Sequence, residues 1–261
     1  MKGARGDFTG TVERVAAVMR VVIEAGDSVG VKEVATALEL PMSTCHRLFD
    51  LLISQGFLEK NAVTHRYSVG IDWFRLASLT LSKYSFNSLV QPVLEELTSN
   101  AGETSLFTIY LPSTNNMMFA AKSDSPELLR YRVDLNVSHP LAWGATGHAI
   151  LAYLPQDARE RAIAASGRSP VGSLPIELPK LELALETVRE KGYAISHAEK
   201  LPGAIGIAVP VFGAPQTVTG SIAFTVPQVR HAHENTERLL QLLRTAASKL
   251  SGTAMLRQQM A

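Results

Sequence analysis

The stretch from residue 31 to residue 60 constrains the fold more than any other, because it holds two short helical patterns separated by a turn. The first pattern has apolar side chains at the one-sided helical spacing i, i+3, i+4, i+7, namely Val31, Val34, Ala35 and Leu38. Pro41 ends it, since the residue before a proline is driven out of the helical region. Proline also favours the first turn of a new helix. The pattern therefore predicts a second helix from Met42 to about Gln55, closed by a left-handed Gly56.

The second helix has the features of a helix that reads DNA. Its apolar stripe contains the chain's single cysteine, Cys45, which we interpret as a small buried hydrophobe. The opposite face is polar, and in a helix-turn-helix the early residues of the second helix meet base edges in the major groove. Short β-like runs at 57–60 and 65–69 flank a turn and predict a hairpin, the wing of a winged helix. We expect these DNA-contacting residues: Lys32, Ser43, Thr44, His46, Arg47, Lys60 and Arg66. The alternative is a structural helical bundle or a winged helix that docks a protein.

Length and composition allow one large core or two modest ones, and the placement of the motifs favours two globular domains. The chain has 261 residues, of which 46% are hydrophobic, and a formal net charge of +1. A nearly neutral balance excludes a non-specific nucleic-acid coat but allows specific binding through a few contacts. No apolar run approaches the ~20 residues of a membrane span, and residues 1–10 lack a signal-peptide core, so we expect a cytoplasmic protein. We expect a DNA-binding domain at 1–70, a linker helix at 71–86 and a second domain at 87–261.

Residues 71–86 have one apolar helical face, which predicts pairing with the same helix of a second copy; packing on its own domain is the alternative. Beyond it, the sequence favours an α+β fold, an antiparallel sheet with flanking helices. Expected strands lie at 104–111, 117–121, 129–134, 204–212 and 218–226. Expected helices begin with a capping box at Ser88 and lie at 88–102, 145–154, 155–166, 179–191 and 234–259, with Pro92 in the first turn of the earliest.

Three segments in the right order resemble the IclR family of bacterial transcriptional regulators. They are LPMSTCHRLFDLLISQGFLE, HPLAWGATGHAILAYLP and GYAISHAEKLPGAIGIAVPVF. The resemblance extends from about Phe8 to the end of the chain. It implies a winged-helix domain, a linker helix and a GAF-like effector domain that binds a small organic acid. It also implies a homodimer or homotetramer on double-stranded operator DNA. The family's Ser-Thr-x-x-Arg pattern is intact here as Ser43, Thr44 and Arg47.

The expected effector pocket departs from the family pattern. Relatives that bind small acids carry an Asp, a Cys and two Ser at positions matching Ser196, Gly206, Ala223 and Thr225. Lost polar groups widen such a pocket, so we expect a larger and less polar ligand, with an aromatic acid as a candidate. Backbone amides around Thr146 and Gly147 would hold its carboxylate. Leu129, Tyr131 and Trp143 would line the pocket; ordinary core packing is the alternative for these three.

An enzyme or metabolite-binding protein acting on a small carboxylate, with a docking winged helix, is the rival class. No phosphate-binding Gly-rich loop, GxSxG or HExxH motif is present in the sequence, so we expect neither catalysis nor a cofactor. His231 and His233 are two residues apart and would not share a helix face, so we expect no metal site. We expect His148 to be exposed, and His197 with Glu199 to lie in a polar pocket or surface loop. A purely architectural DNA binder is disfavoured by the near-neutral charge and the large second domain.

Overall fold

The computed structural model describes residues 10–83, 86–213, 217–231 and 235–251. The chain divides into two compact units, residues 1–84 and 85–261, and each is described by itself. No helix among the described residues is long and apolar enough to cross a bilayer.

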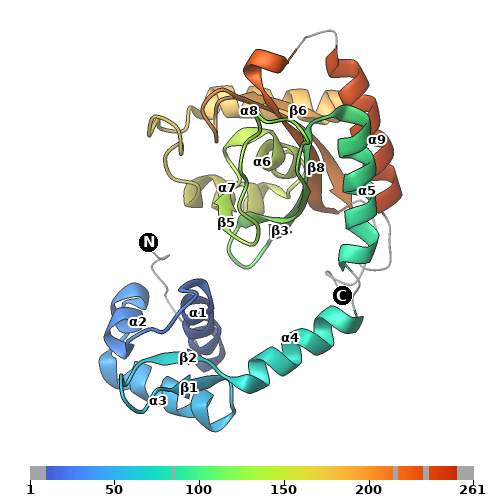
Figure 1. Ribbon diagram of the computed structural model, residues 1–261. Coiled ribbons are helices and arrows are strands. Elements are labelled where there is room, and N and C mark those ends of the chain that lie inside the picture. The colour runs from blue at the N-terminus through green and yellow to red at the C-terminus, as the bar shows by residue number, and fades with distance from the viewer. Residues whose placement is uncertain (1–9, 84–85, 214–216, 232–234, 252–261) are drawn as a thin grey trace. The chain divides into compact units, whose positions relative to one another are not determined.

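The first unit is a winged helix followed by one long helix (Figure 1). Its elements are α1 (Thr11–Glu24), α2 (Val31–Leu38), α3 (Met42–Ser54), β1 (Leu58–Lys60), β2 (Tyr67–Val69) and α4 (Ile71–Lys83). Glu39 ends α2 in the left-handed conformation, at φ 53°, and Gly56 follows α3 at φ 70°. The two strands pair antiparallel with Leu58 opposite Val69, and Tyr67 forms a further bridge to Val29. The hairpin is thus joined to the segment before α2.

The core of the first unit lies between α3 and the other elements. Cys45, Leu48 and Phe49 on α3 are all at most 1% exposed, and they pack with apolar residues of α1, α2 and the hairpin. The Phe49 and Tyr67 rings meet edge to face with centroids 4.6 Å apart, which ties α3 to β2. Burying this inner stripe leaves the polar side of α3 exposed.

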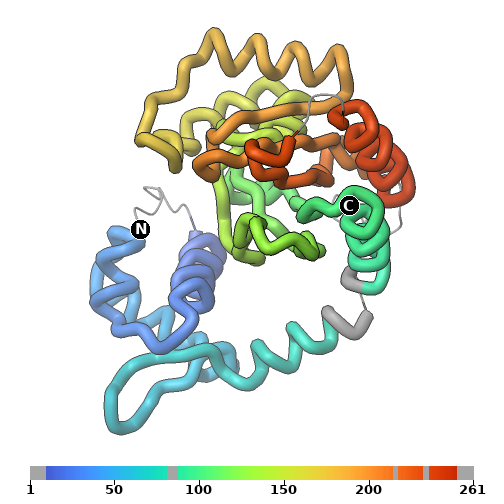
Figure 2. Tube along the Cα trace, turned by 45° about the horizontal axis from the view of Figure 1, so that its top comes forward, coloured from blue at the N-terminus to red at the C-terminus, as the bar shows by residue number. Residues whose placement is uncertain are grey.

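The second unit is an antiparallel sheet of six strands with helices on both faces (Figures 1 and 2). Along the chain it comprises α5 (Phe86–Ala101), β3 (Thr104–Leu111), β4 (Asn116–Ser123), β5 (Ser138–Pro140), α6 (Gly144–Leu151), α7 (Gln156–Ala165), α8 (Leu178–Lys191), β6 (Ala194–His197), β7 (Ala204–Phe212), β8 (Val218–Pro227), the 3-10 turn η1 (Gln228–Arg230) and α9 (Thr236–Leu250). The strand order is β5-β4-β3-β8-β7-β6. The expected α+β class, with an antiparallel sheet and flanking helices, is confirmed.

The two faces of the sheet bury different kinds of side chain. One face carries large apolar residues such as Ile205, Ile207 and Val209 of β7, which pack with α5 and α9. Figure 2 shows these two helices side by side. The other face, toward α6, carries small residues at the alternate positions of the same strand, Ala204, Gly206 and Ala208. Small side chains on this face let the start of α6 approach β7 closely, since a Cβ on Gly206 would lie 3.3 Å from the Ala145 Cβ.

Two expectations for this unit are wrong. No strand runs through 129–134: this segment is irregular, and a short strand, β5, pairs with β4 only from Ser138. Burial follows the alternation only in part, because Leu129 is 56% exposed whereas Val133 is 7% exposed and packs in the core. Pro92 and Ser88 lie inside α5, which begins at Phe86, so the expected capping box does not start the helix. The expected end of the last helix, 251–259, falls largely outside the described residues.

Candidate functional site

The first candidate site is the polar face of α3. Ser43, His46, Arg47 and Asp50 are exposed on it, and Thr44 is half-buried. Their positions follow from the inner stripe, because a helix that buries one side must present the other to solvent. Near the start of α3, hydroxyl and guanidinium donors therefore project together. Hydroxyls suit phosphate oxygens, and an arginine suits either a phosphate or the paired acceptors of a guanine edge.

The wing is held in a defined shape. The Asn61 side-chain oxygen accepts hydrogen bonds from the backbone amides of Val63 and Thr64, each 2.9 Å long. Asn61 also donates its own amide to the Arg66 carbonyl at 2.9 Å, and His65 has a positive φ of 54°. The Lys60 ammonium is exposed and lies 5.6 Å from the centroid of the Tyr67 ring. Lys32, on α2, is also exposed.

Arg66 makes hydrogen bonds within the first unit that could not be predicted from the sequence pattern. Its guanidinium donates to both Glu33 carboxylate oxygens, at 3.0 and 2.9 Å, and to the Ser28 hydroxyl and carbonyl, at 3.1 and 2.7 Å. The hydrogen bond from Arg66, and then that from the Gly30 amide, lowers the pKa of the Glu33 carboxyl. A DNA phosphate would compete with these partners for Arg66.

We expect Arg66→Ala to loosen the wing without unfolding the unit. The variant loses the link between the hairpin and α2, so amide exchange of residues 61–66 should become several-fold faster at neutral pH. Hydrogen exchange followed by mass spectrometry measures this. The matched control, Arg75→Ala, removes an exposed ion pair with Asp72 on α4 and should leave the wing unchanged. Equal wing exchange in wild type and Arg66→Ala would show that the Glu33 contact does not order the wing.

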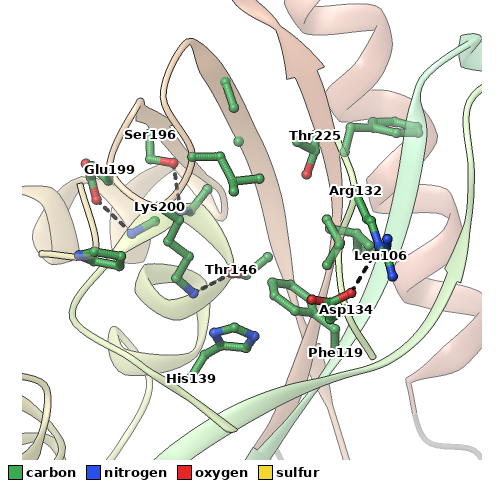
Figure 3. A pocket seen from close by; sticks show the side chains of 18 of the residues that line it. Leu106, Phe119, Arg132, Asp134, His139, Thr146, Ser196, Glu199, Lys200 and Thr225 are labelled. Carbon is green, nitrogen blue, oxygen red and sulfur yellow. Dashed lines mark hydrogen bonds and ion pairs between the residues drawn. The ribbon is translucent and has the colours of Figure 1, made fainter. Parts of the chain in front are cut away.

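The second candidate site is a pocket of about 240 Å³ in the second unit (Figure 3). It lies where the small residues of β7 face the start of α6, and the segment 132–139 and the β6–β7 loop complete its walls. Its lining is mainly apolar, with a few polar groups: Arg132, Asp134, His139, Thr146, Ser196, Glu199, Lys200 and Thr225. Pockets of this kind, apolar with a few placed polar groups, are typical of small-molecule sites.

Lys200 is the principal cation at the inner wall of the pocket. Its ammonium nitrogen lies 3.4 Å from the Thr146 hydroxyl and 3.7 Å from the Met117 sulfur, and 5.6 Å from the centroid of the Phe119 ring. Although part of the side chain faces the open pocket, burial lowers the pKa of the amine to about 7, against a smaller opposing effect of Glu199. Near neutral pH the amine is therefore divided between its charged and neutral forms.

His139, from β5, faces the same space. Figure 3 shows its ring below the end of the Lys200 side chain. Its Nε2 atom is buried, with no hydrogen-bond partner among the described residues. Burial first, and then the nearby Lys200 charge, lowers the pKa of His139 to about 4. The ring is therefore neutral at physiological pH and offers one unused polar atom.

Two amides in the first turn of α6 already have side-chain partners. The Gly144 amide donates to the Glu199 carboxylate at 2.7 Å, and the Ala145 amide donates to the Ser196 hydroxyl at 2.9 Å. His148 is 6% exposed and packs behind them, with Nε2 3.0 Å from the Ala142 carbonyl and 3.6 Å from Glu199. Burial lowers the pKa of this imidazole, and Glu199 opposes the shift. The expectation of an exposed His148 is wrong, and its partner is Glu199, whereas His197 is exposed.

The structure brings four of the nine expected effector residues to the pocket: Thr146, Ser196, Gly206 and Thr225. The other five lie elsewhere. Leu129 is exposed, and Tyr131 donates its hydroxyl to the Pro202 carbonyl at 2.8 Å. Trp143 and Ala223 pack in the core on the α6 side of the sheet. Gly147 is needed for close packing, because a Cβ there would lie 2.1 Å from the Leu141 carbonyl oxygen.

Sequence reasoning missed Lys200 and His139 and placed Arg132 and Asp134 on a strand. No periodic pattern marks a loop lysine or a residue at the edge of a sheet. The available signal for Lys200 was its position between two apolar strand patterns, in the sequence HAEKLPGAIG. Within the described part of the chain, no group of three or more His, Cys, Asp or Glu residues could hold a metal ion.

Comparison with known proteins covers both units. Residues 11–62 match the model of the IclR helix-turn-helix domain, and residues 78–252 match that of the bacterial transcriptional regulator IclR C-terminal domain. The HTH-type transcriptional regulator KipR of Bacillus subtilis is 24% identical over 225 residues, which cover 86% of this chain and 89% of KipR. The HTH-type transcriptional repressor AllR of Salmonella typhimurium is 23% identical over 241 residues, covering 92% of this chain and 88% of AllR.

Solved structures share the fold. A putative IclR transcriptional regulator from Silicibacter sp. TM1040 superposes with a TM-score of 0.83 at 22% identity. The match covers 93% of this chain and 95% of the Silicibacter chain. An IclR homologue from Microbacterium hydrocarbonoxydans was solved in complex with 4-hydroxybenzoate. It superposes with a TM-score of 0.69 at 20% identity, and the match covers 93% of this chain and 98% of the homologue. The matched relatives are named as transcriptional regulators.

Proposed function

Since this chain belongs to the IclR family of bacterial transcriptional regulators, we propose that a small organic acid bound in the pocket changes its affinity for operator DNA. The observation that carries this proposal is a pocket with apolar walls and a lysine amine at its inner end. Apolar walls favour the body of an organic molecule, and an amine that is partly charged favours a carboxylate.

The size of the pocket favours a small metabolite. Its volume of about 240 Å³ lies just below the ~300–1,000 Å³ common for ligand sites. The apolar lining includes Leu106, Phe119 and Val133, which would contact an aromatic ring as well as an aliphatic chain. The complex of the Microbacterium homologue with 4-hydroxybenzoate gives a precedent for an aromatic acid in this fold. An aromatic acid is therefore our preferred class of effector.

DNA binding is assigned to α3 and the wing. Arg47 would donate two parallel hydrogen bonds to a guanine edge or clamp a phosphate, and the hydroxyls of Ser43 and Thr44 would contact phosphates. His46 would reach a base, and Lys60 and Lys32 would approach the backbone. We expect a homodimer or homotetramer, because paired half-sites are read by symmetric proteins. The exposed apolar residues Ile71 and Phe74 of α4 support pairing of that helix with a second copy.

Regulation requires the acid to distinguish two arrangements of the DNA-binding units. A ligand shifts an equilibrium only by its difference in affinity for the two states, and typical couplings are about 1–3 kcal/mol. Calorimetry on the purified full-length protein with benzoate, 4-hydroxybenzoate, pyruvate and glyoxylate tests the choice of effector. We expect the two aromatic acids to bind more tightly than the two short ones. Binding of the short acids alone would overturn the aromatic assignment, and binding of none would overturn the acid effector.

We expect Gly206→Leu to abolish the response to the acid while operator binding without acid persists. A Cβ at position 206 would lie 2.8 Å from the Ser196 hydroxyl and 3.3 Å from Ala145, so a leucine must occupy the pocket. Acid affinity should fall about 5- to 150-fold, since placing extra atoms in filled space commonly costs ~1–3 kcal/mol. Calorimetry and operator titration on the same sample measure both quantities.

The control for Gly206→Leu is Val229→Leu, which enlarges an apolar side chain that is 86% exposed on the same unit. It should bind acid and operator as the wild type does. Thr225→Leu provides a second way to fill the pocket from β8, without the close approach to Ser196. Normal acid binding by both pocket variants would place the effector elsewhere, whereas loss of operator binding as well would indicate misfolding.

A further inference from the structure

The Lys200 amine is held in place without a strong acceptor. The stem of the side chain packs across the start of α6, where a Cβ on Gly144 would lie 3.0 Å from Lys200 Cδ. Gly144 also has a positive φ of 79°, so a side chain there is disfavoured twice. This packing directs the amine toward Thr146 and His139 (Figure 3). The groups nearest to the Lys200 amine are the Thr146 hydroxyl at 3.4 Å, the Met117 thioether and the Phe119 ring, and all three are neutral.

The charged groups around the pocket are mostly engaged with one another. Glu199, in the same loop, accepts the Gly144 amide and lies 3.6 Å from His148. Asp134 forms an ion pair with Arg132 at 3.4 Å, and these two side chains are 70% and 91% exposed to water. Among the described residues, no carboxylate oxygen lies within 4.0 Å of the Lys200 amine. The pocket therefore contains a cationic group that lacks a contacting counter-ion.

We propose that Lys200 is the anchor for the carboxylate of the effector, and that binding of the acid draws a proton onto the Lys200 amine. The inference rests on the proposed function and deepens it, because it names the contact and the ionic form that is recognised. His139 would contribute its unused Nε2 atom as a neutral hydrogen-bond partner beside the anchor. The apolar body of the acid would then lie along the small residues of β7.

The direction of the pH effect follows from the two states of Lys200. In the protein without acid the amine has a pKa of about 7. A bound carboxylate supplies the missing counter-charge and raises that pKa, since an opposite charge within contact favours the charged form. The affinity for the acid is therefore highest below about pH 7. It falls as the pH rises above about 7, until the pH reaches the raised pKa of Lys200 in the complex. A carboxylic acid with a pKa near 4 stays ionised throughout this range.

The other groups that face Lys200 do not produce a loss of acid affinity above neutral pH. His139 has a pKa of about 4, so it remains neutral between about pH 6 and pH 8.5. His148 is buried behind Glu199, and burial keeps its pKa below the ordinary range for histidine. The Thr146 and Ser196 hydroxyls do not titrate in this range. A loss of affinity centred above neutral pH is therefore assigned to Lys200.

The test is calorimetric titration of the full-length protein with benzoate, 4-hydroxybenzoate and pyruvate between about pH 6 and about pH 8.5. For an acid bound at Lys200, the Kd should rise about 30-fold over this range. Repeating the titration at about pH 8 in buffers of different ionisation enthalpy should reveal uptake of about 0.9 proton per acid bound. Lys200→Arg should retain binding and lose the pH dependence, because arginine stays charged. Lys200→Met should bind at least ~10-fold more weakly, with no pH dependence.

Lys180→Met is the matched control, because it removes an exposed lysine of α8 that forms an exposed ion pair with Glu177. It should follow the wild type at every pH. Tight binding that is independent of pH in the wild type, and equal in Lys200→Met, would overturn the anchor while leaving the acid effector intact. Failure of all three acids to bind would overturn the acid effector and the anchor together. If Lys200→Met keeps the wild-type pH dependence, the proton taken up on binding goes to another group and not to Lys200.

Discussion

Arg47→Ala is expected to lower affinity for the operator by about 1–3 kcal/mol for each copy of α3 that contacts DNA, which is roughly 5- to 150-fold. Arg47 is exposed on α3 beside Ser43 and His46, while the opposite side of the helix is fully buried. If Arg47 pairs with a guanine edge, the loss should be confined to the operator and absent from unrelated duplexes. If it holds a phosphate, all duplexes should bind more weakly. The slope of log K against the logarithm of the salt concentration should then decrease in magnitude by about 1.

Titration of labelled DNA at several salt concentrations separates these outcomes. The control is Arg161→Ala, which removes one positive charge from α7 in the other unit, where Arg161 pairs with Asp157 in an exposed ion pair. Arg161→Ala should leave both the affinity and the salt slope nearly unchanged. An Arg47→Ala variant that binds operator and unrelated DNA as the wild type does would remove Arg47 from the DNA-binding surface.

Phe49→Ala is expected to destabilise the first unit by about 3–5 kcal/mol, the usual cost of deleting a fully buried aromatic ring. Phe49 is 0% exposed, and its ring packs edge to face against Tyr67, so the substitution weakens the link between α3 and the wing. Domains are commonly stable by only ~5–15 kcal/mol, so much of the stability of this small unit would be lost. The second unit has its own core clusters and should unfold as before.

Denaturant titration can resolve the two units, because each contains one of the chain's two tryptophans, Trp73 and Trp143. On a Trp143→Phe background, Trp73 reports on the first unit, where it packs against Phe57 with centroids 5.9 Å apart. Val12→Ala on α1 is the control, because Val12 is 81% exposed and its truncation should cost little. An unchanged transition in Phe49→Ala would contradict the assigned core.

The winged helix could be predicted from the sequence because local rules determine it. Helical spacing identified the buried residues of α2 and α3, and Pro41 and Gly56 marked where the helices begin and end. The same rules found β7 and most of the helices of the second unit. They failed at 129–134, where Val133 is buried and Leu129 is exposed, but the segment pairs with no neighbouring strand. Alternation of apolar and polar residues does not by itself provide the hydrogen-bonded neighbour that a strand requires.

The pocket could be predicted only in part because it depends on contacts between distant segments. Gly206 and Ser196 belong to neighbouring strands, and small residues at such positions indicate free space. Lys200 and His139 line one pocket although the β6–β7 loop and β5 belong to opposite edges of the sheet. The Arg66 link to Glu33 likewise joins residues that are far apart in the sequence. Pairings of this kind leave no periodic signal.

The central claim is that occupation of the pocket by an acid controls the affinity of the DNA-binding units for the operator. The most direct measurement is the Kd for a labelled operator fragment, determined with the full-length protein without acid and with saturating 4-hydroxybenzoate at about pH 7. We expect the Kd to shift by about 5- to 150-fold in the wild type and not to shift in Gly206→Leu. The same Kd with and without an acid that calorimetry shows to be bound would contradict it.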